Sequence, residues 1–184
     1  MKRIALLIIA MLTLGFAAQA QSTFSKGTTT ANLGLGIGGT LFSSDYNVIL
    51  PPLSLGIDHS VVSGLFDGNG SIGVGGYFAT ELYHIKGYDK GLWNQTIIGP
   101  RGSLHYQFVD KLDTYFSLML GVDIISWNYN MKVADMAIKD KDTSVGFGWG
   151  AHFGARYYLS DRWALMGELG YGLTFLTLGA TYRF

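Results

Sequence analysis

Apolar residues alternate with polar or small residues along most of this chain, and no other feature of the sequence constrains the fold as strongly. The pattern is clearest at the C-terminus, where apolar residues occupy every second position from Leu176 to Phe184 and threonine, glycine or arginine lies between them. Alternate side chains of a β-strand point to opposite faces of the sheet, so the pattern predicts strands with one apolar face and one polar or small face. After residue 20, no run of apolar residues is long enough for a transmembrane helix.

Eight segments of the chain show this alternation. The predicted strands cover residues 28–39, 51–62, 70–84, 93–108, 111–128, 143–160, 162–172 and 174–184. The connections differ in length: 40–50, 85–92 and 129–142 are predicted as longer loops, and 63–69, 109–111 and 160–162 as shorter turns. An even number of strands, with long loops on one side and short turns on the other, is typical of bacterial outer-membrane barrels.

The polar face of the predicted strands indicates which side meets lipid. It is rich in glycine, which weakens a strand that faces water but fits the narrow interior of an eight-stranded barrel. The same face carries charged and imidazole side chains: Arg101, His105, His152, Arg156, Glu168 and Arg183. The sequence therefore predicts an all-β fold, a closed eight-stranded antiparallel up-and-down transmembrane β-barrel with its apolar face toward lipid. The alternative is a soluble, lipocalin-like barrel with the apolar face inside.

The N-terminus has the three parts of a signal peptide. Lys2 and Arg3 are followed by an apolar stretch at 4–16, and Ala18-Gln19-Ala20 supplies the small residues of a cleavage site. We expect cleavage after Ala20 and a barrel domain over 21–184, located in the outer membrane of a Gram-negative-type cell. The alternative is an uncleaved membrane anchor, although the apolar run is shorter than the roughly 20 residues of a spanning helix.

The composition excludes several classes of function. Removing Lys2 and Arg3 leaves 11 basic and 13 acidic residues, a net formal charge of −2, which does not indicate nucleic-acid binding. The chain has no cysteine, which rules out a lipoprotein anchor, disulfides and thiolate metal sites. Its four histidines show no metal-site spacing. We predict no cofactor, no metal and no catalytic residue.

Two sets of aromatic residues fall near the predicted strand ends, as expected for rings at the membrane interfaces. The outer set is Tyr83, Trp93, Trp127 and Tyr129. The inner set is Phe108, Tyr157, Trp163 and Phe184.

The inward charges allow two interpretations. Arg101, Arg156 and Arg183, with Glu168 and Asp58, form either an ion path or a plug of salt bridges that makes the barrel rigid. Charges in a narrow lumen must be paired, because an unpaired buried charge costs several kcal/mol. We therefore favour the plug and expect Glu168 to pair with an arginine.

Two further features stay open. An enzyme at the outer rim would need a Ser/His/Asp set, and His84, Asp123 and Ser126 are nearest to one, although no local motif supports them. The segment 129–142 alternates lysine and aspartate among apolar residues. It is predicted either as a mobile solvated loop or as a surface for an external partner.

The segment from Tyr157 to Gly172, followed by the final Tyr182-Arg183-Phe184, resembles the outer-membrane β-barrel domain family, the small OmpA/OmpX-type barrels often labelled porin family. The resemblance implies a barrel in outer-membrane lipid. It also implies a C-terminal signal at Tyr182 and Phe184 for the barrel-assembly machinery. It does not imply one activity, because members include structural proteins, adhesins, narrow pores and a few enzymes.

We thus expect a monomeric, non-catalytic barrel with a structural or envelope role or a surface-interaction role. The alternatives are a narrow passive pore and a lipid-modifying enzyme.

Overall fold

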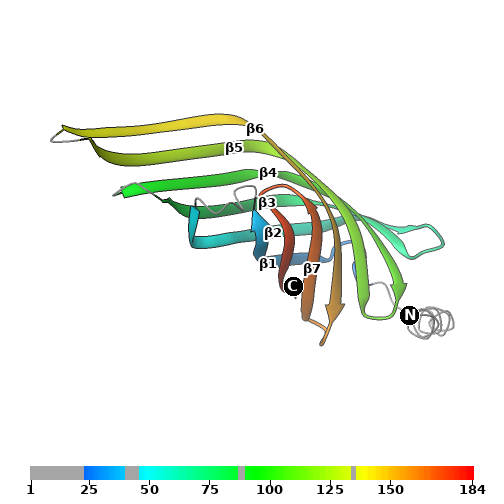
Figure 1. The fold of residues 1–184 in the computed structure, drawn as a ribbon. Coiled ribbons are helices and arrows are strands. Elements are labelled where there is room, and N and C mark those ends of the chain that lie inside the picture. The colour runs from blue at the N-terminus through cyan, green and yellow to red at the C-terminus, as the bar shows by residue number, and fades with distance from the viewer. Residues whose placement is uncertain (1–22, 40–45, 87–89, 134–135) are drawn as a thin grey trace, which may run out of the picture.

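The computed structural model describes residues 23–39, 46–86, 90–133 and 136–184, so the predicted signal peptide lies outside the described residues. The described part contains eight strands: β1 (Thr29–Gly39), β2 (Tyr46–Leu65), β3 (Gly70–Ile85), β4 (Lys90–Val109), β5 (Leu112–Val133), β6 (Met136–Tyr158), β7 (Trp163–Tyr171) and β8 (Thr174–Arg183). Each strand pairs antiparallel with the next, and β8 pairs with β1, which closes the barrel (Figure 1). The predicted fold class is confirmed.

The side chains alternate across the barrel wall as the sequence pattern predicts. On β5, Leu118 points outward and is half exposed, whereas its neighbour Met119 points inward and is 1% exposed. All eight strands contribute exposed apolar side chains to the outer surface, among them Leu33, Leu55, Val74, Leu104, Leu118, Phe153, Leu165 and Leu178. A continuous apolar belt of this kind marks a surface that does not face water. It contradicts the soluble alternative, which needs these side chains inside.

The height of the apolar belt matches a membrane. On β5 every outward position between Thr114 and Ser126 is apolar, from Phe116 to Ile124. A strand rises about 3.4 Å per residue. At the tilt of about 40° found in such barrels, the eight steps from Phe116 to Ile124 span about 21 Å along the barrel axis, which is close to the roughly 25 Å apolar band of outer-membrane barrels.

Five strands are much longer than the other three. The pairing of β6 with β7 ends at Ala151 and Tyr171, and that of β1 with β2 ends at Leu35 and Leu53. Beyond these pairs, β2 to β6 continue as an open sheet that we call the extension, bordered by Tyr46–Pro52 of β2 and Met136–Gly150 of β6. Figure 1 shows it running well past β7 and β1.

The extension corrects three loop predictions. Residues 46–50, 90–92 and most of 129–142 are strand, and β5 and β6 stay in register up to Val133 and Met136. The alternation weakens in these three segments because they lie beyond the apolar belt, so nothing requires one apolar face. The backbone hydrogen bonds nevertheless continue the ladder. Residues 40–45 of the predicted loop 40–50 lie outside the described residues.

The opposite end of the barrel carries the tight turns at 66–69, 110–111 and 159–162 and the C-terminus, and we call it the short-turn end. The predicted inner aromatic set, Phe108, Tyr157, Trp163 and Phe184, is exposed there. The outer set is placed differently. Tyr83 is 2% exposed and its phenol donates to Glu81 Oε2 at 2.9 Å.

Trp93 and Trp127 share the inward parity of Tyr83. Trp93 lies four residues before the buried Ile97 on β4, and Trp127 lies eight residues after the buried Met119 on β5. The prediction of an aromatic ring facing the membrane is wrong for these positions, because an aromatic residue near a strand end faces lipid only if it lies on the outward face of the strand. The side chain of Tyr129 lies outside the described residues. The described residues contain no helix long and apolar enough to cross a membrane.

Candidate functional site

The barrel lumen is crossed by a network of ion pairs, which we call the lumen cluster: Asp58, Arg101, Asp113, Tyr115, Arg156 and Glu168. Arg156 donates to Asp58 and, at 3.3 Å, to Asp113. Arg101 pairs with Glu168 and lies 3.9 Å from Asp58. All the charged side chains of the cluster are almost fully buried.

The cluster joins five strands across the lumen, because Asp58 comes from β2, Arg101 from β4, Asp113 and Tyr115 from β5, Arg156 from β6 and Glu168 from β7. Tyr115 lies between the two arginines. Its ring faces the guanidinium of Arg156 at 4.3 Å and that of Arg101 at 5.5 Å, and its hydroxyl donates to Glu168 at 2.7 Å. Such charge-assisted contacts are stronger than neutral hydrogen bonds. The arrangement fills the lumen with paired charge.

The structure places the predicted site residues in three groups. Arg101, Arg156 and Glu168 belong to the lumen cluster, and His105 joins it through Asp113, at 2.8 Å. His152 is buried with its ring 5.8 Å from that of Tyr77 and makes no hydrogen bond through Nε2 within the described residues.

Arg183 lies apart from the lumen cluster, at the short-turn end. It is partly buried, donates to the backbone carbonyl of Thr23 at 3.0 Å and faces the ring of Tyr158 at 5.0 Å. Asp113 and Tyr115 are not among the site residues predicted from the sequence. Both occupy the inward parity of β5, so the same alternation rule could have found them.

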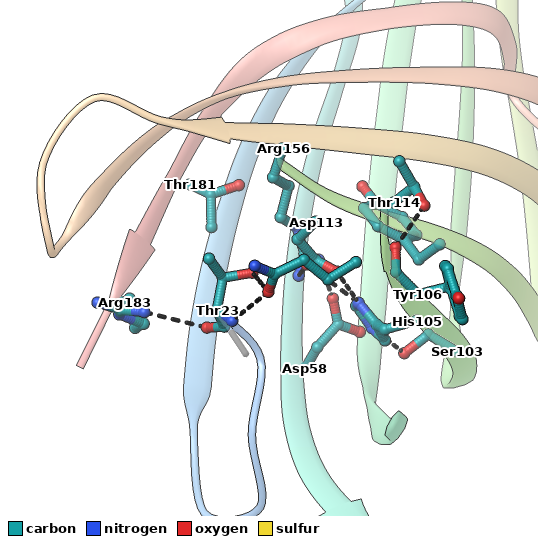
Figure 2. A network of polar contacts seen from close by, with 12 residues as sticks. Thr23, Asp58, Ser103, His105, Tyr106, Asp113, Thr114, Arg156, Thr181 and Arg183 are labelled. Carbon is teal, nitrogen blue, oxygen red and sulfur yellow. Dashed lines mark hydrogen bonds and ion pairs between the residues drawn. The ribbon is translucent and has the colours of Figure 1, made fainter. Parts of the chain in front are cut away.

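Ser103, His105 and Asp113 form a hydrogen-bonded chain beside the cluster (Figure 2). His105 Nε2 lies 2.9 Å from Ser103 Oγ, and His105 Nδ1 lies 2.8 Å from a carboxylate oxygen of Asp113. This is the connectivity of a Ser-His-Asp triad, in which a carboxylate orients the imidazole and the imidazole accepts the serine proton.

The surroundings of this chain do not suit acyl transfer. Ser103 is 5% exposed, so a substrate would have to open the lumen to reach it. Ser103 is also paired on both sides, with Gly73 of β3 and Ser117 of β5. The backbone N–H groups around it therefore donate to the neighbouring strands. An oxyanion hole needs N–H donors that point at the substrate. Asp113 is in addition shared with Arg156.

The rim set considered for an enzyme is not assembled. Asp123 accepts from Gln95 Nε2 at 2.7 Å and has the inward parity of Met119, whereas Ser126 has the outward parity of Leu118 and bonds Thr143 at 3.1 Å. The wall of the barrel therefore separates the carboxylate from the serine. Within the described residues, no group of three His, Asp or Glu side chains could hold a metal ion.

The outward face of the extension is polar just above the apolar belt. Thr80 and Thr96 share a hydrogen bond of 2.9 Å, and Asn94 donates to Thr80 at 3.2 Å and to the backbone of Glu81 at 2.8 Å. On β5 and β6 the Ser126–Thr143 bond lies at the same level. These groups mark where the apolar surface ends.

The border of the extension at β6 has no paired strand. Within the described residues, β6 forms a ladder with β7 only from Ala151 to Tyr158, and nothing pairs with that side of the strand up to Gly150. Backbone groups along such an edge are available to another strand. Of the predicted loop 129–142, the structure describes the side chains of Asp140, Lys141 and Asp142, which are exposed.

Comparison with known proteins identifies the fold. No protein-family model and no curated protein matches the sequence. Among solved structures, the chain is similar to Ail, the attachment invasion locus protein of Yersinia pestis, with a TM-score of 0.52 and 13% identity over 86% of this chain and 99% of that one. The crystal structure of Ail with the heparin analogue sucrose octasulfate matches with the same TM-score and 14% identity, over the same shares of the two chains. This chain therefore has the fold of an eight-stranded outer-membrane barrel.

Proposed function

We propose that this protein is an integral outer-membrane barrel with a closed lumen that presents the extension to a partner outside the cell, without catalysis. The observation that carries the proposal is the combination of a lumen filled by paired charges with an open sheet whose edge at β6 pairs with no further strand of the described residues. In this orientation the short-turn end faces the periplasm and the extension faces outward, as in other barrels with short periplasmic turns.

The membrane location rests on the apolar belt. Its height and its continuity over all eight strands suit a bilayer, and pairing of β8 with β1 closes the barrel where all eight strands are present. Export by a signal peptide cleaved after Ala20 belongs to the same proposal, as does assembly through the C-terminal Tyr182 and Phe184. Phe184 is exposed at the short-turn end, where a factor in the periplasm could bind it.

The lumen cluster acts as a plug and not as an ion path. An ion path needs charges that are hydrated and free to exchange partners. Arg101 and Arg156 are instead buried and paired with carboxylates from opposite walls. The cluster ties β2, β4, β5, β6 and β7 together, which makes the barrel rigid below the extension.

The free edge of β6 suits a partner that adds a strand to the sheet. In this mode, backbone hydrogen bonds supply affinity and alternate side chains supply specificity. The crystallised complex of Ail carries a sulfated sugar, but the β6 strand of this chain alternates acidic and basic residues at Asp140, Lys141 and Asp142. That mixture favours a protein partner over a polyanion.

A shortened hairpin tests the proposal. Trp127 pairs with Asp142, so replacing residues 128–141 by Asn-Gly leaves a two-residue turn on an intact ladder. Cells that carry the shortened chain should lose attachment to like cells and to protein-coated surfaces, while the barrel keeps its heat-modifiable migration on gels. The matched control Ser126→Ala keeps the strand length and should attach normally. Equal attachment by the shortened chain would contradict a role for the extension.

The pore alternative is tested in planar bilayers. The folded protein should show no steady single-channel openings, because the lumen cluster closes the path. Steady openings that change when Arg101 or Arg156 is replaced would favour the pore. The enzyme alternative predicts an altered lipid profile in a deletion strain, and we expect an unchanged one.

A further inference from the structure

The chain before β1 turns back into the lumen. Thr23 and Phe24 are buried, and Phe24 is 1% exposed although it lies outside every strand. The reversal between this segment and β1 is made at Gly27, whose φ of +90° is in the region that favours glycine. The turn is held by bonds from Thr28 N to Ser25 O and from Gly27 N to Ser60 O, each 2.9 Å.

The ring of Phe24 occupies a space built from three strands. It stacks on the His105 imidazole with a centroid distance of 3.9 Å and an interplanar angle of 26°. The Arg156 guanidinium faces the same ring at 5.8 Å. A Cβ at residue 73 would lie 3.1 Å from this ring, so glycine at that position leaves the room that the ring fills.

The backbone of the segment is held as specifically as the ring. Thr23 donates to the side-chain carbonyl of Gln107 twice, from N at 2.6 Å and from Oγ1 at 3.1 Å. Its own carbonyl accepts from Arg183 at 3.0 Å. Figure 2 shows Arg183 and Thr23 on one side of the network and His105, Ser103 and Asp113 on the other. Gln107 is buried, so its side-chain carbonyl accepts from the segment and not from bulk water.

We propose that the short-turn end of the lumen is a binding site for an aromatic-bearing peptide segment, occupied by this chain's own Thr23–Lys26 with Phe24 as the anchor. The site, which we call the lumen floor, consists of Gly73, His105, Gln107, Arg156 and Arg183. These residues come from β3, β4, β6 and β8, which meet only when the barrel is closed. The segment therefore docks after closure and seals the lumen at this end.

A polar cavity of about 440 Å³ lies directly outside the segment. It is lined by Thr23, Ser25, Asp110, Lys111, Tyr158 and Arg183, among others. Thr23 and Arg183 thus lie between the cavity and the other residues of the lumen floor. Solvent and solutes reach the segment from this side, and the lumen cluster closes the other side, so release of the segment exposes the floor without opening the barrel.

Cysteine labelling tests the site, because the natural chain has no cysteine. In a Ser103→Cys chain the introduced thiol lies beside His105 and is covered by Phe24. It should react slowly with iodoacetamide in the folded barrel. Adding Phe24→Ala should raise the labelling rate about tenfold or more, since a local opening replaces a closed contact. A synthetic peptide of residues 21–26 should restore protection, and the same peptide with alanine in place of phenylalanine should not.

Two controls separate the lumen floor from general loosening. Ser54→Cys lies elsewhere in the lumen, on β2, and should stay protected with and without Phe24. Phe66→Ala removes an exposed ring at the short-turn end and should leave the Ser103→Cys rate unchanged. Folding is checked by heat-modifiable migration. If Phe24→Ala does not fold, Gln107→Met, which removes only the acceptor for Thr23, should raise the rate instead.

The proposal is overturned if the Ser103→Cys chain reacts at the same rate with Phe24 and without it. It is also overturned if the Ser54→Cys rate rises in parallel, or if the peptide gives no protection to the folded variant. None of these outcomes depends on the external partner or on the lumen cluster's resistance to ions, so the proposed function can fail while this site stands.

Discussion

Arg156 and Asp58 lie 98 residues apart in the chain and form an ion pair in the lumen with both side chains completely buried. One comes from β6 and the other from β2, so the pair spans the barrel and does not connect adjacent strands. Arg156 is also paired with Asp113 of β5. This guanidinium therefore bridges two buried carboxylates, whose other contacts are Arg101 at 3.9 Å for Asp58 and the His105 imidazole at 2.8 Å for Asp113.

Replacing Arg156 should destabilise the barrel strongly. Arg156→Met removes the shared cation and leaves Asp58 with the more distant Arg101 and Asp113 with the His105 imidazole, and breaking a buried pair in this way costs about 3–5 kcal/mol. The urea midpoint of unfolding in detergent, followed by the gel shift of the folded form, measures the loss.

Neutralising a carboxylate at the same time should recover part of that loss. Arg156→Met combined with Asp58→Asn removes one of the two carboxylates that have lost this cation, so the double variant should be more stable than Arg156→Met alone. A double variant that is less stable by the sum of both single losses would mean that charge pairing is not what Arg156 provides.

Glycine 154 should not accept a methyl group. A Cβ there would overlap the ring of Tyr115, which is held by Glu168 and cannot move without breaking that bond. Gly154→Ala should destabilise the barrel by about 1–3 kcal/mol, as overpacking does in closed interiors. Gly102→Ala is the matched control because a Cβ at residue 102 meets nothing within 4 Å. Equal effects of the two variants on the unfolding midpoint would refute the overlap.

Charge on the outer wall should be costly only within the apolar belt. Leu118→Arg places a cation near the middle of the belt, where such substitutions cost about 2–4 kcal/mol in barrels, falling toward zero near the interface. Ser126→Arg lies above the belt on the same strand and should change the stability little. Unfolding midpoints in lipid vesicles measure both, and a similar cost at the two positions would argue against the proposed membrane boundary.

Ser103 should not behave as an enzyme nucleophile. Its hydrogen bond to His105 has the geometry of a triad, but burial and the lack of free backbone donors keep an acylating or phosphonylating reagent away. A fluorophosphonate probe should leave the folded protein unlabelled while it labels a serine hydrolase added to the same tube. Labelling at Ser103, located by mass spectrometry, would reopen the enzyme alternative.

The strand faces could be predicted because side-chain direction along a strand is a local property. Whether Leu118 or Met119 points outward depends only on parity, and glycine on the inward face indicates a narrow interior. The same rule placed Arg101, Arg156 and Glu168 in the lumen. It also places Tyr83 inside, whereas closeness to a strand end alone predicts Tyr83 in the outer aromatic set.

By itself, then, the sequence determined that eight amphipathic strands close into a barrel with lipid outside, because the alternation of apolar with polar or small residues is a local property of each strand. Only the tertiary structure decided which charges meet, since Asp58 and Arg156 become partners through strand register and closure. It also decided that β5 and β6 run on as an open sheet, where water on both faces removes the need for alternation. The place of Phe24 on the lumen floor was decided in the same way, because its contacts come from strands that meet only in the closed barrel.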